Sequence, residues 1–364
     1  MTLELKSVTK KVRGETHIDT VSLTLTHGTL NILLGPTLSG KTSLMRLMAG
    51  LDAPTEGKIF FDGKDVTGVP VRRRSVAMVY QQFINYPNLT VYENIASPLR
   101  VAGTGKDELD RRVRDTAALM KLTPLLDRRP LELSGGQQQR TALARAMVKG
   151  ANLVLLDEPL ANLDYKLREE LREELPRIFS ATGAIFVYAT TEPIEALLLG
   201  GSTATLARGR ITQFGPTLEV YRRPNSLETA QIFSDPPMNT LAVEKREKQL
   251  ASSAGHLTLP ASGLFAGLAD GPYTLGFRPN HLYLKQPSRE AVPVTGTVAI
   301  TEITGSESFV HVDFAGQRWV ALAHGVHELD IGQPVEIWLD PGRFFVFDKS
   351  GALAAAPGLN RAAA

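Results

Sequence analysis

The stretch Leu133-Ser-Gly-Gly-Gln-Gln-Gln-Arg140, followed by Leu153-Val-Leu-Leu-Asp-Glu-Pro159, decides the fold of this chain. Ser134 and the two glycines after it predict the start of a helix that is capped by a hydroxyl group. The first N–H groups of such a helix lack partners within the helix and carry the positive end of its dipole, so they form an anion site. The helix is expected to end at Gly150, because glycine readily adopts the left-handed conformation that terminates helices.

The second half of this stretch predicts a buried strand that ends in two carboxylates. Four consecutive apolar residues, Leu153 to Leu156, are typical of a parallel strand covered on both faces. The strand brings Asp157 and Glu158 to its carboxyl end, which is the edge where open α/β sheets bind ligands. A capped helix start is common by itself, but together with this strand it indicates phosphate chemistry.

A second phosphate-binding pattern lies nearer the N-terminus. Leu30 to Leu34 predict a buried strand, the residues after it fit the P-loop, and a helix is expected to follow as far as Gly50. The loop amides would surround a β-phosphate, Lys41 would reach the β- and γ-phosphate oxygens, and the Thr42 hydroxyl would ligate Mg²⁺. The loop residues are Gly35, Pro36, Thr37, Leu38, Ser39, Gly40, Lys41 and Thr42. The two patterns together predict an α/β P-loop nucleoside triphosphatase.

The composition limits the class of protein further. The 364 residues are enough for two or three domains with substantial cores. With 40 basic and 38 acidic residues the net charge is only +2, so no overall field favours nucleic acid. The absence of cysteine excludes disulfides and thiolate metal sites. Because we find neither a secretory signal nor an apolar run of about 18 residues, we expect other chains to bring this one to any membrane.

These motifs resemble those of the ATP-binding cassette (ABC) ATPases. The resemblance implies a RecA-like core with an antiparallel β subdomain and a helical subdomain. In this family two chains form a head-to-tail dimer, and each ATP lies between the P-loop of one chain and the signature motif of the other. Glu158 would polarise the attacking water, and Asp157 would support Mg²⁺ through a water molecule. The signature residues, which would bind the partner's nucleotide, are Ser134, Gly135, Gly136 and Gln137.

The resemblance extends to three further segments. Gln81 follows a strand predicted to end at Tyr80, and it matches the family glutamine that contacts Mg²⁺ and the attacking water. The run from Gln82 to Arg100 resembles the segment with which carbohydrate-importer ATPases dock on their permeases. Residues 161–164 resemble the loop that crosses the ATPase dimer interface.

Helical periodicity disappears in the last third of the chain. We expect the nucleotide-binding domain over residues 1–235, with the helical subdomain at about 82–150. Short alternating runs separated by Gly, Pro and Asp predict an all-β, OB-like barrel domain over 236–350. It carries no basic stripe with interleaved aromatic residues, which argues against nucleic acid as a partner. The alanine-rich end, 351–364, is expected to be disordered.

Three positions depart from the family pattern, and all belong to one half of one ATP site. Thr191 stands where the family has a histidine that hydrogen-bonds the γ-phosphate, and loss of one such donor typically costs about 10²–10³ in rate. Val12 falls where an aromatic ring usually stacks on adenine, and Leu38 replaces a P-loop glycine. His17 is an open alternative as the adenine contact. A weakened P-loop side beside an intact signature predicts one half of an asymmetric pair of ATPases.

We therefore expect an ATP-binding and ATP-hydrolysing subunit of an ABC importer for a small carbohydrate or polyol, with ATP and Mg²⁺ as cofactors. Tyr80 to Arg100 and Thr190 to Pro193 resemble the paired ATPases of glycerol importers. The implied partners are a second ABC ATPase, two permease subunits contacted through residues 81–100 and, indirectly, a periplasmic solute-binding protein. The implied location is the cytoplasmic face of the bacterial inner membrane.

Two alternatives stay open at this point. A soluble ABC ATPase of repair or translation would share the ATPase motifs, although such proteins lack the C-terminal barrel and the permease-docking run. A structural subunit that holds nucleotide without hydrolysing it would keep the same fold. The intact Glu158 argues against complete loss of chemistry but does not decide the matter.

Overall fold

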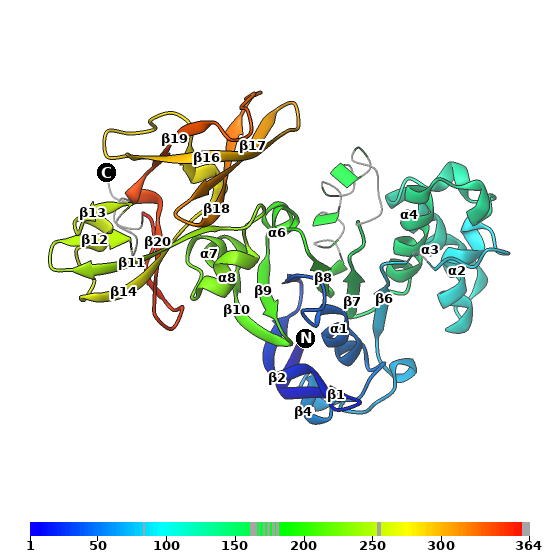
Figure 1. Cartoon of the computed structure of the whole chain (residues 1–364). Helices are drawn as coiled ribbons and strands as arrows, with labels where there is room; N and C mark the ends of the chain where they lie inside the picture. Colours follow the sequence, from blue (N-terminus) through cyan, green and yellow to red (C-terminus); the bar gives the residue numbers. More distant parts are fainter. Residues whose placement is uncertain are drawn as a thin grey trace, which may run out of the picture. The chain divides into compact units, whose positions relative to one another are not determined.

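The computed structural model describes residues 1–82, 84–160, 166, 168–169, 172, 175–176, 179, 182–252 and 256–358 (Figure 1). The expected loop at the dimer interface, 161–164, lies outside this part of the chain. The chain divides into two compact units, Met1–Thr217 and Leu218–Ala364, which we describe separately.

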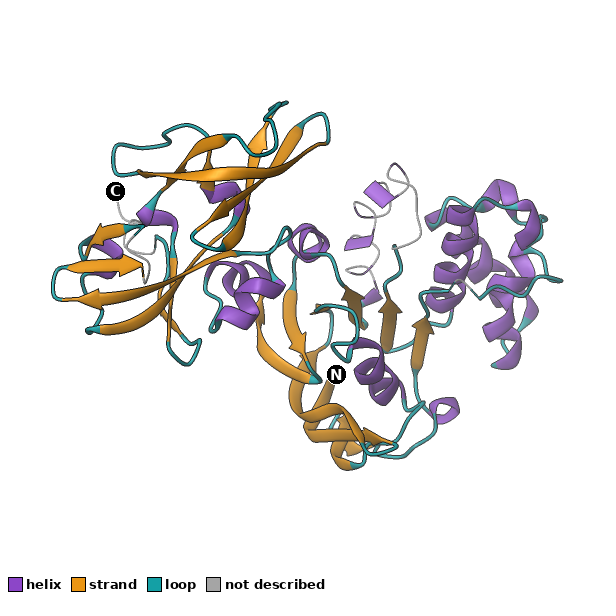
Figure 2. Ribbon diagram, in the orientation of Figure 1, coloured by secondary structure: helices purple, strands orange, loops and turns teal. Residues whose placement is uncertain are grey.

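A six-stranded, mainly parallel sheet forms the centre of the first unit (Figure 2). Its strand order is β10-β9-β3-β8-β7-β6, and only β10 is antiparallel to its neighbour. All described residues of β7 and β8 are buried, as expected for strands covered on both faces. The strands are β3 (Leu30–Leu34), β6 (Val76–Val79), β7 (Leu153–Asp157), β8 (Ile185–Thr190), β9 (Ser202–Ala207) and β10 (Arg210–Pro216). This arrangement confirms the predicted P-loop fold.

A four-stranded antiparallel sheet, in the order β2-β1-β4-β5, packs against the central sheet through helix α1 (Lys41–Ala49). Its strands are β1 (Thr2–Val12), β2 (Glu15–Thr26), β4 (Glu56–Phe61) and β5 (Lys64–Asp65). Alternate residues of β1 and β2 point inward, and one hydrophobic core joins Leu5, Leu44 and Leu155 from the three layers. The core fixes α1, and with it the P-loop, between the two sheets.

Three helices form the helical subdomain: α2 (Val91–Val101), α3 (Lys106–Leu119) and α4 (Gly135–Val148). A capping box of Thr90 and Glu93 starts α2. The fully buried Asn94 side chain donates to the carbonyls of Tyr86, Leu89 and Thr90 and accepts from the Tyr86 N–H, so it holds the loop before α2 in place. Helix α4 ends before Gly150, as predicted.

Two antiparallel sheets share one core in the second unit, which confirms the predicted all-β module. The first has the order β13-β12-β11-β14-β20-β21 and the second β15-β19-β16-β17-β18. The strands are β11 (Asn239–Arg246), β12 (Gln249–Ser252), β13 (Thr258–Pro260), β14 (Gly271–Phe277), β15 (Leu282–Tyr283), β16 (Val292–Ile303), β17 (Glu307–Phe314), β18 (Gln317–His324), β19 (Pro334–Leu339), β20 (Phe345–Asp348) and β21 (Leu353–Ala355).

The division between the units differs from the predicted boundary at residues 235 and 236. The reason is that α8 (Leu227–Ile232) packs on the second unit, where Ala230 contacts a small core that includes Phe345 and Phe347. Helix α7 (Thr217–Arg222) begins at the division, and α6 (Pro193–Leu199) precedes it in the first unit. The disorder expected for the C-terminal end is corrected in part, because β21 pairs with β20; residues 359–364 lie outside the described range.

Removing the Phe277 ring tests whether the two units have independent cores. This buried ring meets Trp319 edge to face, with 5.0 Å between the ring centroids. We expect Phe277→Ala to lower the free energy of unfolding of the second unit by about 3–5 kcal/mol. Nucleotide binding should be unchanged, because the phosphate-binding segments belong to the first unit. The measurements are calorimetric unfolding and nucleotide titration.

The matched control is Val326→Ala, since this side chain lies in the second unit and is 56% exposed. A soluble Phe277→Ala protein that no longer bound nucleotide would show that the two units do not have independent cores.

Candidate functional site

Three parallel strands place the phosphate-binding motifs at one edge of the central sheet. In β3 and β8, Leu34 lies opposite Thr190, and in β8 and β7, Ala189 lies opposite Asp157. The P-loop and the acidic pair therefore both follow strands that end at the same edge. The Glu158 N–H donates to the Ala189 carbonyl at 3.0 Å, which continues the sheet contact one residue beyond β7.

The Lys41 ammonium lies at the centre of this edge. Its Nζ donates to the carbonyls of Gly35 (2.8 Å) and Pro36 (3.1 Å) and lies 3.6 Å from Oε1 of Glu158. The other carboxylate oxygen of Glu158 accepts a hydrogen bond from Nε2 of Gln81 at 3.1 Å. Residues that lie far apart in the sequence thus meet in one group, joined by hydrogen bonds and an ion pair.

Thr42 and Asp157 form the part of the site that fits a hard cation. The Thr42 hydroxyl donates to Oδ2 of Asp157 at 2.9 Å. A hydroxyl, a carboxylate and the amide oxygen of nearby Gln81 are ligands that suit Mg²⁺, which in nucleotide sites takes few protein ligands and keeps water and phosphate oxygens. No group of three acidic, histidine or cysteine side chains poised to hold a metal occurs among the described residues. The donor set therefore fits a cation that binds together with a nucleotide.

Burial shifts the pKa values of two charged side chains at this edge, Lys41 and Asp157. It lowers the pKa of Lys41, whose side chain is 5% exposed, and the attraction of Glu158 opposes this shift. Burial also raises the pKa of Asp157, against the hydrogen bond from Thr42. Removing a charge from water is costly unless opposite charges replace the solvent. A triphosphate with its cation would supply those opposite charges.

Leu38 keeps the P-loop in a conformation that normally suits glycine. Its φ is 67°, in the left-handed region, and its side chain is 97% exposed. A leucine in this conformation costs about 1–2 kcal/mol, whereas a glycine there has no such penalty. The loop therefore has a glycine-like conformation at Leu38 and carries an exposed apolar side chain there.

A cavity of about 640 Å³ lies over the P-loop. Val12, Thr191 and the signature residues 134–137 are not among the residues that line it. Four other predicted residues lie behind this lining. The carbonyls of Gly35 and Pro36 accept hydrogen bonds from Lys41, Ser39 is buried, and Asp157 accepts a hydrogen bond from Thr42, which lines the cavity. From the predicted set the lining contains Thr37, Leu38, Gly40, Lys41, Thr42, Gln81 and Glu158.

Residues that the motifs do not include also line this cavity. They come from the start of β2, where His17 lies, and from the turn between β9 and β10, formed by Arg208 and Gly209. The sequence indicates a hairpin turn at Arg208-Gly209, but nothing in the local pattern indicates that this turn lies beside the P-loop.

The position of the missing histidine lies next to a buried hydrogen-bonded group. The Thr190 hydroxyl donates to Oε2 of Glu195 at 2.6 Å, and the Tyr188 hydroxyl donates to the same oxygen at 3.1 Å. The Glu192 N–H donates to the Thr190 hydroxyl at 3.0 Å. These bonds fix the chain on both sides of Thr191, whose own side chain is exposed.

The signature segment forms the predicted helix N-terminus. The Ser134 hydroxyl accepts from the Gln137 N–H at 3.4 Å, and the Gln137 side chain accepts from the Ser134 N–H at 3.1 Å, so a capping box starts α4. A Cβ atom on Gly135 would meet no atom within 4 Å. This chain therefore leaves the approach to the Gly135 amide open for another molecule.

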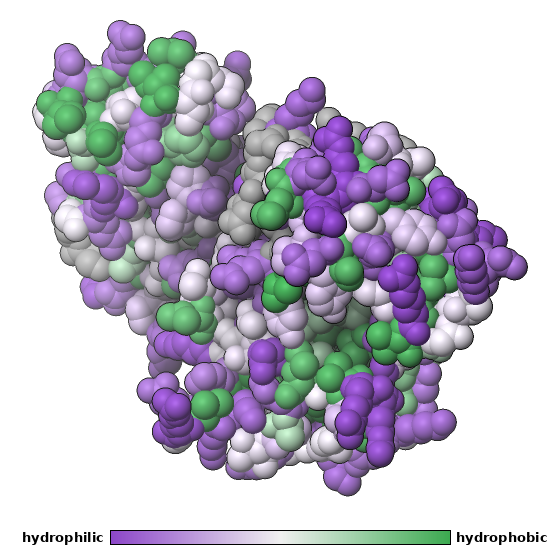
Figure 3. Space-filling view, turned by 90° about the vertical axis from the view of Figure 1, so that its right-hand side faces the viewer, coloured by the Kyte–Doolittle hydropathy of each residue, from purple (hydrophilic) through white to green (hydrophobic). Residues whose placement is uncertain are grey.

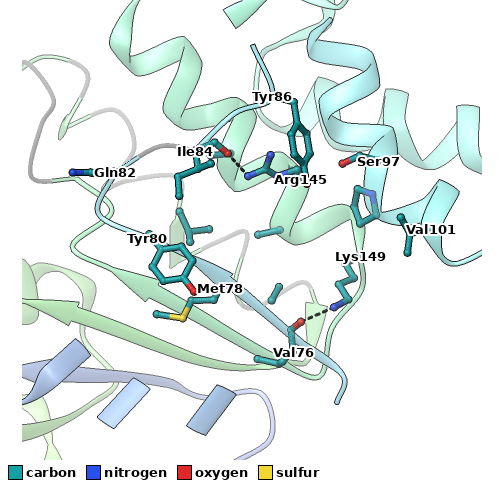
Figure 4. A pocket seen from close by; sticks show the side chains of 15 residues that line it. Val76, Met78, Tyr80, Gln82, Ile84, Tyr86, Ser97, Val101, Arg145 and Lys149 are labelled. Atoms are coloured by element: carbon teal, nitrogen blue, oxygen red, sulfur yellow. Dashed lines mark hydrogen bonds between the residues drawn. The ribbon is translucent and has the colours of Figure 1, made fainter. Parts of the chain in front are cut away.

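A second cavity, of about 330 Å³, lies between β6 and the helices α2 and α4 (Figure 4). Arg145 of α4 donates to the Ile84 carbonyl and lies over the Tyr86 ring at 4.9 Å, and Lys149 donates to the Val76 carbonyl at 2.7 Å. We call this cavity the interdomain groove, a name that here means the groove within the first unit between the central sheet and the helical subdomain. Figure 3, which views the molecule from the side of these helices in Figure 1, shows apolar surface recessed among hydrophilic side chains.

Exposed apolar side chains at the interdomain groove include Val101, which is 91% exposed, and Ile84. Such surface is characteristic of a contact with another protein. Throughout the described residues, every helix is too short or too polar to cross a bilayer.

Two family models match this chain: one described as ABC transporter, over residues 18–161, and one described as TOBE domain, over residues 275–347. The chain is 35% identical over 355 residues to the sn-glycerol-3-phosphate import ATP-binding protein UgpC of Yersinia enterocolitica, covering 96% of this chain and 98% of that protein. It is 37% identical over 356 residues to the trehalose/maltose import ATP-binding protein MalK of Thermococcus litoralis, covering 93% and 96% respectively.

The fold is also similar to solved structures of ATP-binding cassettes. A dimeric bacterial ABC transporter cassette matches with a TM-score of 0.54 and 28% identity, over 59% of this chain and 98% of that chain. A dimeric cassette in a post-hydrolysis state, bound to ADP and phosphate, matches with a TM-score of 0.53 and 29% identity, over the same shares of the two chains.

Replacing the Thr42 hydroxyl tests the assignment of the cation ligands. We expect Thr42→Val to abolish most of the strengthening of ATP binding by Mg²⁺, because valine keeps the shape of threonine but has no oxygen. ATP binding without Mg²⁺ should be unchanged. Calorimetric titration of ATP with and without Mg²⁺ measures both quantities.

Thr42→Ser is the matched control, since it keeps the hydroxyl and should keep the Mg²⁺ effect. If Thr42→Val responded to Mg²⁺ as the unmodified protein does, Thr42 would not be a ligand.

Proposed function

The chain belongs to the ATP-binding subunits of ABC transporters, and from this premise we propose that it hydrolyses ATP to drive an importer of a small carbohydrate or polyol. The observation that carries the proposal is the contact of both Lys41 and Gln81 with Glu158 at the edge of one nucleotide-sized cavity. The names of the relatives, which import glycerol-3-phosphate and trehalose or maltose, support the class of solute.

The chemistry would be distributed over the five connected side chains. Lys41 would exchange its bonds to backbone carbonyls for bonds to the β- and γ-phosphate oxygens. Thr42, with Gln81 and with Asp157 through water, would hold Mg²⁺, which when bound neutralises charge on the phosphate oxygens. Glu158 would then orient and polarise the attacking water. Its left-handed φ of 46° and its N–H bond to β8 fix the direction in which its side chain leaves the chain.

We propose the interdomain groove as the permease contact. The groove is lined by part of the predicted docking run, including Gln82 and Tyr86. Val101, the residue after the end of this run, also lines the groove. Gln81, which binds Glu158, is the neighbour of Gln82 in the groove. A permease segment in this groove would therefore contact Gln82, whose neighbour in the chain, Gln81, hydrogen-bonds the catalytic carboxylate of Glu158.

We also propose that this chain pairs with a different ATPase. The support comes from the contrast between its two half-sites, because the signature helix is capped and open while the P-loop side lacks a γ-phosphate histidine and an adenine ring. The similar dimeric cassettes support a dimer as such. In a head-to-tail pair, Ser134 to Gln137 would complete the partner's ATP site.

The proposed location is peripheral, on the cytoplasmic face of the inner membrane, with two permeases and, through them, a periplasmic binding protein as partners. Within the polyols, glycerol is our proposed solute, on the resemblance of residues 80–100 and 190–193 to the ATPases of glycerol importers.

A soluble ABC ATPase without permeases is disfavoured by the TOBE domain match over residues 275–347. A purely structural subunit is disfavoured by the intact contacts of Glu158.

Assembly should control the rate of hydrolysis. Purified alone, this chain should release phosphate from ATP about 10²-fold more slowly than in a complex with a second ATPase and the permeases, because its own site lacks a γ-phosphate donor. Steady-state phosphate release by the chain alone and by the reconstituted complex is the measurement. A homodimer that turned over as fast as the complex would contradict the asymmetric pair.

Two single substitutions show which half of the chain carries the chemistry. Gly135→Asp places a negative group where the partner's γ-phosphate would approach, and it should abolish ATP hydrolysis and solute uptake by the assembled transporter. Lys41→Ala weakens a site that already lacks a donor and a ring, so a measurable fraction of both activities should remain.

Gly267→Asp is the matched control for the glycine substitution, because Gly267 also has open space around its Cβ position and lies in the second unit. Complete loss of activity in both Gly135→Asp and Lys41→Ala would mean that this chain's own P-loop site also turns over, and the asymmetric assignment would fail.

A further inference from the structure

The cavity over the P-loop is lined by more than the phosphate-binding groups. Two planar polar side chains, His17 and Arg208, also line it, and both residues are exposed. Among the described lining residues there is no Phe, Tyr or Trp. The first Phe, Tyr or Trp of the sequence is Phe60, so His17 is the ring that the N-terminal strands bring to this cavity.

The Arg208 turn is joined to the P-loop by direct backbone contacts. The Gly209 N–H donates to the Ser39 carbonyl at 2.9 Å, and the Gly209 carbonyl accepts from the Asp19 N–H at 2.9 Å. A Cβ on Gly209 would lie 2.6 Å from the His17 carbonyl oxygen, so only glycine allows this approach. The turn, strand β2 and the P-loop therefore meet backbone to backbone, without side chains between them.

An ion pair fixes the same turn on β2 from its other side. Arg210 binds one carboxylate oxygen of Asp19 through Nε at 2.8 Å and Nη2 at 2.5 Å, and this contact lowers the pKa of Asp19. Arg208 and His17 thus lie on two segments that are joined by a backbone hydrogen bond, from the Asp19 N–H to the Gly209 carbonyl, and by this ion pair. The backbone positions of both residues beside the cavity are therefore fixed.

The position of these side chains matches the part of a nucleotide that the phosphate site leaves unbound. With the phosphates at Lys41 and the loop amides, the sugar and base would occupy the rest of the same cavity, whose lining includes the start of β2 and the Arg208 turn. A guanidinium group stacks on aromatic faces through cation–π and planar contact, and an imidazole stacks on bases as other aromatic rings do.

We propose that Arg208 and His17 form the platform for the purine base of ATP, in place of the aromatic ring that the family uses. The inference rests on the proposed function, in which this cavity binds ATP. Base recognition would then depend on the Arg208 turn, which belongs to none of the sequence motifs. The weakened half-site would bind the base through the guanidinium group of Arg208.

The test compares two ligands, ATP and inorganic triphosphate, at fixed Mg²⁺ and ionic strength, by calorimetric titration of the full-length chain. Arg208→Asn is the main variant, because asparagine tolerates the left-handed φ of 46° at this position. It should weaken ATP binding by about tenfold and leave triphosphate binding within about twofold. His17→Ala should act in the same direction. Arg208→Lys should recover little, since lysine keeps the charge but not the plane.

Arg72→Asn is the matched control, because Arg72 is an exposed arginine of the same unit that does not line the cavity. Equal weakening of ATP and triphosphate by Arg208→Asn would make Arg208 a phosphate contact and overturn the proposal, as would unchanged ATP binding. If the unmodified chain bound neither ligand, the proposed function itself would fail. Binding of triphosphate as tight as that of ATP would overturn the base platform alone.

Discussion

The ionic contact between Lys41 and Glu158 is the interaction on which the phosphate-binding edge depends. It joins the P-loop, which follows β3, to the carboxylate that follows β7, and it exists because both strands are parallel neighbours of β8. The Lys41 side chain is 5% exposed and the Glu158 side chain 20%, so their mutual attraction only partly replaces the hydration that they have lost. The site is therefore built to accept a polyanion and a cation together, since each compensates one of the buried charges.

The same edge is connected to the surface that we assign to the permease. Gln81 holds Glu158, and the next residue along the chain, Gln82, lines the interdomain groove together with Tyr80. The groove is formed by β6 and by the helices α2 and α4, and the buried Asn94 fixes the loop before α2. The groove is thus linked to the carboxylate by one peptide bond, from Gln82 to Gln81, and one hydrogen bond, from Gln81 to Glu158. The signature helix α4 also lines the groove, so the permease contact that we propose there would touch the helix that carries the signature residues.

The departures from the family pattern are concentrated at the P-loop side, and the structure gives each a physical consequence. Leu38 keeps a glycine-like conformation at an energetic cost, and Thr191 is fixed beside a buried hydrogen-bonded group without lining the cavity. The turn with Arg208 brings a cation to the same cavity. The half-site is altered in what it offers the nucleotide, while its backbone framework is intact.

The sequence by itself determined the features that depend on neighbouring residues. The apolar runs before Gly35 and Asp157 specify buried strands, the Ser134 segment specifies a capped helix, and short alternating runs specify the C-terminal module, because each pattern acts over one element. Only the tertiary structure decided which distant segments meet. It excluded Val12 from the cavity and placed Arg208 there, since the strand order of the sheet and the backbone contact at Gly209 control that approach. It also assigned α8 to the second unit, because its apolar face packs against strands that come more than a hundred residues later.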